Sequence, residues 1–221
     1  MKYLIVGNGA AGIAAAEKIR QLDKNGEISI LSSEKYPVYS KCLLPDFLSG
    51  QVSEDRMFIR DTDFYEKKNI NIYYNHKVLD VDFKLKEVIA GSRDNHIKPS
   101  SIFAYDKLLI ATGSTQIVPP INGLNTSDIY FLSTLDEAKQ IMEDSRDARR
   151  ILIIGAGFVG LEAAFNLYKK GKEVTILERR HRILPNMLDE RASQIIQNSL
   201  EEEGIRLVLD ASVSEVSNTV Y

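Results

Sequence analysis

Two glycine-rich stretches with the same spacing constrain the fold of this chain more than any other feature. Residues 2–16 read KYLIVGNGAAGIAAA, and residues 150–164 read RILIIGAGFVGLEAA. In each, an apolar run leads into Gly-x-Gly-x-x-Gly, and an apolar, alanine-containing helical pattern follows. This order predicts a strand, a tight turn and a helix whose N-terminus receives the pyrophosphate of a dinucleotide. Two copies predict two dinucleotides, and therefore electron transfer between them.

The three glycines of each copy have different physical roles. The first permits the tight turn, the second lets backbone approach the pyrophosphate, and the third lets the helix pack closely on the strand. The candidate cofactor-binding residues are Gly7, Gly9, Ala11 and Gly12 in the first copy, and Gly155, Gly157 and Gly160 in the second.

A carboxylate that binds the adenosine ribose is expected where the second strand of each unit ends. After the predicted strand Glu27–Leu31 this place is occupied by Ser32, and the candidate carboxylate is Glu34, two residues later. After the predicted strand Glu173–Leu177 it is Glu178.

The same position bears on the choice of nicotinamide cofactor. Glu178 favours NADH, because a carboxylate would repel the 2′-phosphate of NADPH. Three arginines follow closely and could attract that phosphate, so NADPH stays open: Arg179, Arg180 and Arg182.

The remaining pattern predicts an α/β chain with two Rossmann-like domains, each built on a parallel sheet. Short β segments between polar turns in residues 77–103 predict an antiparallel meander in the first domain. Residues 106–114 predict a further buried strand, and the proline-containing residues 116–125 a crossover. We place an FAD-type domain at 1–114 and an incomplete NAD(P)-type domain at 115–221. Further helices are expected at 45–50, 61–69, 134–143, 157–170 and 189–203, and further strands at 70–74, 150–154 and 205–209.

Composition limits the class of protein. With 44% hydrophobic and 27% charged residues, the chain has the composition of an ordinary globular protein. A net charge of −3 provides no basic field for nucleic acid or anionic membrane. No apolar run reaches the roughly 18 residues of a membrane span, and Met1 directly precedes the first strand, which leaves no room for a targeting segment. The single cysteine, Cys42, fits a reducing compartment, so we expect a cytoplasmic protein.

The three histidines predict no metal site. His76, His96 and His181 lie among polar turns and have no second ligand at metal-binding spacing.

Four stretches, in this order, resemble the FAD-dependent pyridine nucleotide-disulphide oxidoreductases. They are GNGAAG at 7–12, YDKLLIATGS at 105–114, GAGFVGLEAA at 155–164, and VTILERRHRILP at 174–185 followed by DERASQIIQNSLEEEGI at 189–205. The resemblance implies that the first glycine motif binds FAD and the second binds NADH or NADPH. It also implies that Thr112 and Gly113 lie near the FAD and that the backbone of Val78 meets its adenine.

Glu162 is expected in the first turn of the second helix, where a carboxylate complements the helix dipole. The resemblance instead implies that Glu162 faces the flavin and nicotinamide region. Relatives of this family continue beyond the position of Tyr221, so we expect a fragment of a longer protein that forms a homodimer through a C-terminal domain.

Residues 37–50, PVYSKCLLPDFLSG, resemble two subfamilies that differ in chemistry. A cysteine followed by x-Leu-Pro, as at Cys42, resembles coenzyme A-disulphide reductases, NADH oxidases and NADH peroxidases. The register Tyr39-Ser40-Lys41 resembles rubredoxin reductases and the large subunits of nitrite reductases, and Lys41 is a candidate cofactor-binding residue. Leu43 departs from the first pattern, and Lys41 and Cys42 depart from the second.

Cys42 is the candidate catalytic residue. Pro45 predicts a short helix that begins just after the cysteine, and a helix N-terminus and a neighbouring lysine, here Lys41, favour the thiolate form. With one cysteine, turnover would need a mixed disulphide with a small thiol or a sulfenic acid. The acceptor would then be a disulphide, oxygen or peroxide.

Two alternatives remain. In the first, Cys42 is not catalytic, and electrons pass from FAD to a protein such as rubredoxin. A free cysteine is most often simply a small buried hydrophobic residue. In the second, the chain is a dinucleotide-binding module without turnover.

Overall fold

A computed structural model of the protein describes residues 1–92, 99–124 and 129–216, and the chain forms two compact units. The first unit comprises residues 1–40 and 58–114, and the second comprises 41–57 and the residues from Thr115 onward. The division after Ser114 lies where we placed the domain boundary. Residues 41–57, which we assigned to the first domain, pack within the second unit instead.

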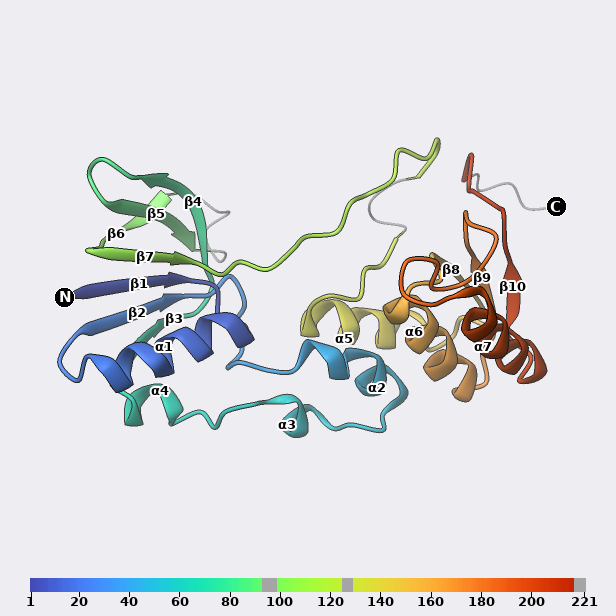
Figure 1. The fold of residues 1–221 in the computed structure, drawn as a ribbon, viewed down its shortest axis with the longest axis horizontal. Coiled ribbons are helices and arrows are strands. Elements are labelled where there is room, and N and C mark those ends of the chain that lie inside the picture. Colours follow the sequence, from blue (N-terminus) through green and yellow to red (C-terminus); the bar gives the residue numbers. More distant parts are fainter. Residues whose placement is uncertain (93–98, 125–128, 217–221) are drawn as a thin grey trace. The chain divides into compact units, whose positions relative to one another are not determined.

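The elements follow the predicted order of strands and helices (Figure 1). The first unit contains β1 (Lys2–Val6), α1 (Ala10–Leu22), β2 (Glu27–Leu31), α4 (Phe64–Lys67), β3 (Ile70–Tyr73), β4 (His76–Asp82), β5 (Glu87–Ser92), β6 (Pro99–Ala104) and β7 (Lys107–Ile110). The second contains the 3₁₀ turn η1 (Lys41–Leu43), α2 (Leu44–Ser49), α3 (Glu54–Met57), α5 (Leu135–Asp144), β8 (Arg150–Ile154), α6 (Phe158–Lys169), β9 (Glu173–Leu177), α7 (Glu190–Glu202) and β10 (Arg206–Val208).

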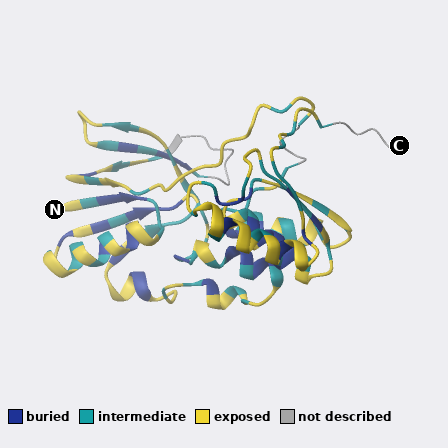
Figure 2. Cartoon of the chain, turned by 45° about the vertical axis from the view of Figure 1, so that its right-hand side comes forward, coloured by how far each residue is buried: buried dark blue, intermediate teal, exposed yellow. Residues whose placement is uncertain are grey.

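The first unit is built on a parallel sheet in the order β3-β2-β1-β7. Successive side chains of a strand point to opposite faces of a sheet. Ile5 and Ile30 therefore pack with Ile13 of α1, whereas Leu4 and Leu31 pack with Val88, Ala90 and other residues of the antiparallel meander β4-β5-β6. Buried residues of these strands are dark blue in Figure 2. Both faces of this sheet are thus covered, as a parallel sheet requires.

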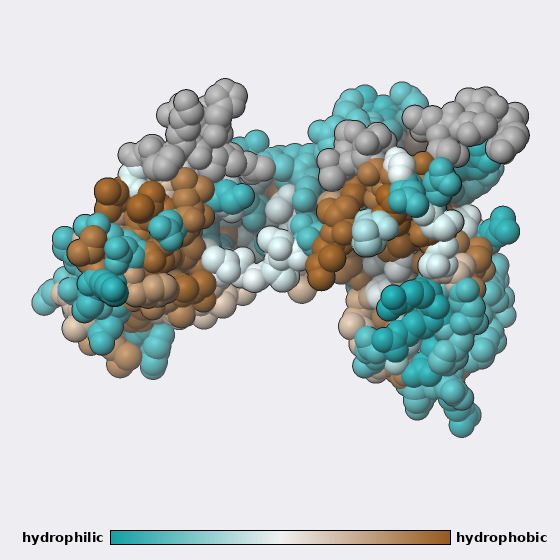
Figure 3. Space-filling view, turned by 90° about the horizontal axis from the view of Figure 1, so that it is seen from above, coloured by the Kyte–Doolittle hydropathy of each residue, from teal (hydrophilic) through white to brown (hydrophobic). Residues whose placement is uncertain are grey.

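The second unit is also built on a parallel sheet, in the order β10-β9-β8, and one face of that sheet packs on helices. Its core includes Ala164 and Leu167 of α6 packed against Ile176 of β9. Leu152 and Ile154, on the other face of β8, are 55% and 52% exposed. Within the described residues β8 pairs with β9 alone, whereas β1 pairs with both β2 and β7. Apolar surface on each unit is brown in Figure 3.

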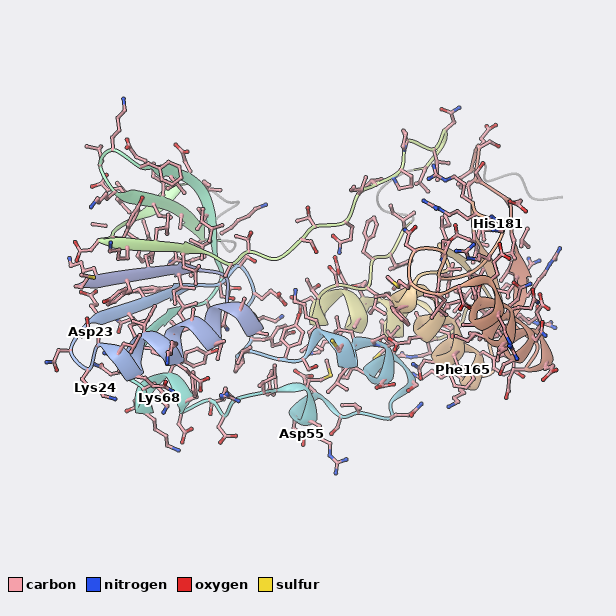
Figure 4. All side chains as sticks on the ribbon, in the orientation of Figure 1. Asp23, Lys24, Asp55, Lys68, Phe165 and His181 are labelled. Atoms are coloured by element: carbon pink, nitrogen blue, oxygen red, sulfur yellow. The ribbon has the colours of Figure 1, made fainter. Side chains whose placement is uncertain are left out.

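Arg20 joins the turn that follows α1 to the turn that follows α4. The guanidinium of Arg20 donates to the carbonyl oxygens of Asp23, Lys24 and Gly26, and to those of Lys68 and Asn69, at 2.7–3.1 Å. Figure 4 labels three of these partners beside α1 and α4. The N–H groups of Gly26 and Asn25 donate to the carboxylate of Asp23 and hold its pKa below the usual range. Residues 23–26 thus form a hydrogen-bonded turn between α1 and β2.

Two short helices differ from the prediction. The helix expected at 61–69 is limited to α4, because Asn69 adopts a left-handed φ of 52° that ends the helical geometry. Helix α3 was not predicted, since four residues are too few to show helical periodicity. Parts of two predicted segments, residues 93–98 of the meander and residue 125 of the crossover, lie outside the described residues.

In residues 1–92, 99–124 and 129–216, no helix has the length and apolar character needed to cross a membrane. The same residues contain no cluster of three His, Cys, Asp or Glu side chains that could hold a metal ion. His76 Nδ1 lies 2.7 Å from the carbonyl oxygen of Tyr74, and His181 Nε2 lies 3.3 Å from Arg182 Nη1. His96 lies outside the described residues.

Candidate dinucleotide-binding sites

The first glycine turn lies at the carboxyl edge of its sheet. Gly7 follows β1 with a φ of 114°, and its N–H donates to Leu31 O at 2.9 Å. A Cβ on Gly12 would lie 2.1 Å from Gly7 O, so only glycine fits there. A Cβ on Gly9 would meet nothing within 4 Å. Gly9 is the N-cap of α1 and Ala11 is exposed in its first turn, so the backbone here faces open space into which a ligand can approach.

The second glycine turn has the same geometry. Gly155 follows β8 with a φ of 104°, and Gly157 is the N-cap of α6. A Cβ on Gly160 would lie 2.2 Å from Gly155 O, while one on Gly157 would meet nothing within 4 Å. At both turns, open backbone and the unpaired first N–H groups of a helix fit a pyrophosphate.

The end of β7 lies beside the first turn. The N–H of Ala111 donates to Val6 O at 2.8 Å, and a Cβ on Gly7 would lie 2.1 Å from Ala111 O and 3.2 Å from Thr112 N. Gly113 follows, exposed and with a φ of 73°. The structure therefore brings Thr112 and Gly113 next to the motif for which the resemblance implies FAD.

Val78 belongs to the meander on the same side of the first sheet as Leu4. It pairs with Ala90 of β5 and packs, partly buried, against the cluster formed by Leu4, Leu31 and Val88. Its side chain thus contributes to the core, which leaves only its backbone for the implied contact with adenine.

Ser32 and Glu34 form one hydrogen-bonded turn after β2. Ser32 is only 4% exposed, and its Oγ donates to Glu34 O at 3.0 Å and accepts from Glu34 N at 3.2 Å. Glu34 Oε2 accepts the hydroxyl of Tyr39 at 2.6 Å. Ser32 therefore shapes the turn, and Tyr39 orients the carboxylate two residues later.

Glu178 lies directly against the second glycine turn. Its Oε2 accepts the N–H of Ala156 and its Oε1 accepts the N–H of Arg180, both at 2.9 Å. Arg182 donates through Nη2 to the carbonyl oxygens of Pro185 and Leu188, at 2.9 and 3.3 Å. Of the three arginines considered for a 2′-phosphate, Arg182 thus stabilises the following turn, whereas Arg179 and Arg180 are exposed.

Cys42 is an exposed free thiol in η1, next to the exposed Lys41. Helix α2 begins two residues later at Leu44, and it ends where Gly50 adopts a φ of 80°. The expectation that a free cysteine is a buried hydrophobic residue is therefore wrong for Cys42.

The position of Glu162 differs from the prediction that it lies in the first turn of its helix. Because Gly157 is the N-cap, α6 begins at Phe158 and Glu162 is its fifth residue, exposed in the second turn rather than the first. Its carboxylate therefore lies beyond the first turn, where an acidic side chain most effectively complements the dipole.

Sequence reasoning missed Asn8 and Tyr65. Asn8 stands between Gly7 and Gly9, and its Oδ1 accepts the hydroxyl of Tyr65 at 2.9 Å. The two residues are 57 positions apart, Asn8 is at an unspecified (x) position of the glycine motif, and Tyr65 belongs to no recognisable motif. The one indirect signal is that Ser32 stands where the motif expects a carboxylate.

Comparison with known proteins gives a family match over nearly the whole chain. The family model described as pyridine nucleotide-disulphide oxidoreductase matches residues 1–220. An NADH oxidase of Methanocaldococcus jannaschii is 30% identical over 220 residues, which are 98% of this chain and 48% of that protein. A rubredoxin-NAD(+) reductase of Pseudomonas putida is 29% identical over 217 residues, which are 98% of this chain and 54% of that protein.

A solved structure agrees with these relatives. An NAD-dependent persulfide reductase from A. fulgidus superposes with a TM-score of 0.91 and 32% identity, over 99% of this chain and 41% of that one. The chain thus spans about half the length of the curated relatives it matches. The family match supports FAD and NAD(P)H as cofactors, and a water-forming NADH oxidase from Lactobacillus brevis with NADH bound is among the similar solved structures. With two glycine turns of matching geometry and a family match over residues 1–220, this chain belongs to the pyridine nucleotide-disulphide oxidoreductase family.

Proposed function

We propose that this chain is the nucleotide-binding part of a flavoprotein that oxidises NADH, with FAD at the first glycine turn and NADH at the second. The observation that carries the proposal is the repetition of the same glycine-only contacts at Gly12 and Gly160, each beside an open helix N-terminus. When bound, the flavin supplies two-electron chemistry, taking a hydride from the nicotinamide and giving the electrons to an acceptor. The residues of this chain bind and orient the two cofactors.

The proposed FAD site is assembled from four parts of the first unit. The turn at residues 7–12 receives the pyrophosphate, the backbone of Thr112 and Gly113 borders it, and Glu34, oriented by Tyr39, binds the ribose. The backbone of Val78 meets the adenine. At the second turn, Glu162 faces the nicotinamide region.

NADH is the favoured nicotinamide cofactor because of the position of Glu178. Its carboxylate already accepts an N–H of the second glycine turn, where the adenosine ribose of a bound dinucleotide would lie. A 2′-phosphate placed there would meet a negative charge at short range.

Glu178→Gln is expected to lower the preference for NADH over NADPH about tenfold, a change of about 1.4 kcal/mol in relative binding free energy. The amide keeps an acceptor for the turn and removes the repulsion of the phosphate. Titration of the protein with NADH and NADPH, followed by nicotinamide fluorescence, gives the two Kd values. Glu173→Gln is the matched control, because Glu173 lies at the other end of β9 and is paired with Arg149 at 2.7 Å. An unchanged Kd ratio in Glu178→Gln would contradict this role.

The function itself is tested by an anaerobic visible spectrum before and after addition of NADH. We expect flavin bands that bleach with NADH, because hydride transfer requires both cofactors in one protein. A colourless protein that takes up no added FAD would overturn the proposal and favour a dinucleotide-binding module. Flavin bands that NADH leaves unchanged would restrict the proposal to FAD binding.

For the acceptor, we propose a route through Cys42. Its exposed thiol can attack a disulphide, which forms a mixed disulphide and releases one thiol. Two electrons from NADH and two protons then regenerate the Cys42 thiol and release the second thiol. With hydrogen peroxide, the thiol becomes a sulfenic acid with release of water, and two electrons and two protons return it to the thiol with a second water.

A second candidate is a protein acceptor such as rubredoxin, with Cys42 not involved. The similarity to a rubredoxin-NAD(+) reductase over 98% of this chain favours it. The two candidates differ in one measurable respect, namely whether reduction of the acceptor requires the thiol.

A further inference from the structure

The two glycine turns are held by different groups. In the second turn, the middle residue Ala156 donates its N–H to Glu178, which directly follows β9. In the first turn, the residue that directly follows β2 is Ser32, and its Oγ bonds to the backbone of Glu34. Ser32 therefore does not hold the first turn in the way that Glu178 holds the second.

In the first turn, the side chain of the middle residue, Asn8, makes hydrogen bonds that tie the turn to other segments. Its Oδ1 accepts the hydroxyl of Tyr65 in α4 at 2.9 Å, and its Nδ2 donates to Tyr36 O at 3.3 Å. The Tyr65 hydroxyl also accepts the N–H of Val38 at 3.1 Å. One asparagine thus joins the first glycine turn to α4 and to the segment that follows β2.

Tyr65 is well placed to act as a fixed anchor. It is 3% exposed, and its ring packs edge-on against Phe64 and Tyr74, with ring centroids 5.3 and 6.2 Å apart. Burial, together with the neighbouring Tyr65, raises the pKa of Tyr74 well above its usual range, so that this neighbour stays a neutral phenol. Removal of the Tyr65 hydroxyl would leave a buried N–H of Val38 and the Asn8 oxygen without this partner.

We propose that Asn8 and Tyr65 are positioning residues for FAD, and that they order the Gly7–Gly9 turn before the cofactor binds. The proposal rests on the proposed assignment of FAD to this turn. A turn that is already ordered loses less conformational entropy on binding, so the hydrogen-bonded pair contributes to affinity without touching the cofactor.

The test uses Tyr65→Phe, which keeps the ring and removes only the hydroxyl, and Asn8→Ala. Tyr3→Phe is the matched control, since the Tyr3 hydroxyl also donates one hydrogen bond to a side chain of the first unit, to Asp23 at 3.2 Å near the far end of α1. The Kd for FAD is measured by quenching of flavin fluorescence. Amide hydrogen exchange of the FAD-free chain is measured by mass spectrometry.

We expect Tyr65→Phe and Asn8→Ala each to raise the Kd for FAD about tenfold. In the FAD-free chain, both should speed exchange in peptides covering residues 5–13 about fivefold and leave peptides covering 153–161 unchanged. The double variant should add little to either single variant, because the two residues act as one unit.

Unchanged FAD affinity and exchange in Tyr65→Phe would overturn the proposal. Equal effects in Tyr3→Phe would also overturn it, because they would show a general loss of stability rather than a local one. If the wild-type chain binds no FAD, the proposed function fails, and with it the role toward FAD. The exchange data on the FAD-free chain then still decide whether Tyr65 orders the turn.

Discussion

Gly12→Ala is expected to destabilise the first unit by about 3 kcal/mol, whereas Gly9→Ala leaves it folded and weakens FAD binding about a hundredfold. The added Cβ at Gly12 would lie 2.1 Å from the backbone oxygen of Gly7, so strand and helix must move apart. The added Cβ at Gly9 meets no protein atom within 4 Å, but it occupies the space from which a pyrophosphate would approach. The two substitutions are chemically identical and separate folding from binding.

Thermal unfolding and FAD titration of both variants check this prediction. For a unit of this size, a loss of about 3 kcal/mol lowers the Tm by on the order of 15 °C. The second glycine turn supplies an independent pair, since Gly160→Ala should destabilise the second unit and Gly157→Ala should weaken NADH binding. Normal FAD affinity in Gly9→Ala would show that the open space at the first turn is not where the cofactor binds.

Cys42→Ser is expected to lower the reduction of a disulphide or of peroxide about a thousandfold while NADH-to-dye transfer stays within about twofold. Serine keeps the size of the side chain and removes the sulfur on which a mixed disulphide or sulfenic acid forms. A dye takes electrons from the reduced flavin without the thiol, so hydride transfer from NADH is measured separately in the same variant.

Ser40→Ala, two residues before the cysteine, is the control for disturbance of the local chain. Equal losses in the disulphide and dye assays would mean that Cys42 has a structural role. Full activity in both would favour the protein acceptor, and rubredoxin-dependent oxidation of NADH by the same variant would then be the direct assay.

The residues at the two glycine turns show which parts of the fold the local sequence pattern predicts. The elements around Gly7 and Gly155 were predictable because strand, turn and helix follow one another within about fifteen residues and each glycine has a steric reason. The antiparallel meander was predictable from alternation and polar turns, and the register of β4, β5 and β6 confirms it. Helices α3 and α4 are too short to carry a periodic signal, so one was missed and the other was predicted too long.

The two carboxylates show what the sequence pattern does not predict, namely their hydrogen-bond partners. Glu178 stands at the expected place, yet only the structure shows that it accepts the N–H of Ala156. Ser32 occupies the corresponding place in the first unit, and the sequence does not indicate that Tyr39 orients Glu34 two residues later. Each of these contacts depends on the path of a turn, which composition and spacing do not specify.

The sequence by itself determined two strand–turn–helix units, their order, the meander and the class of ligand, because these follow from residue types at short spacing. Only the tertiary structure decided which side chains hold the turns: Asn8 with Tyr65 in the first unit, and Glu178 in the second. It also decided that Cys42 is exposed and that residues 41–57 pack with the second unit. The physical reason is that these contacts join residues far apart in the chain, whose proximity arises only when helices and sheets pack together.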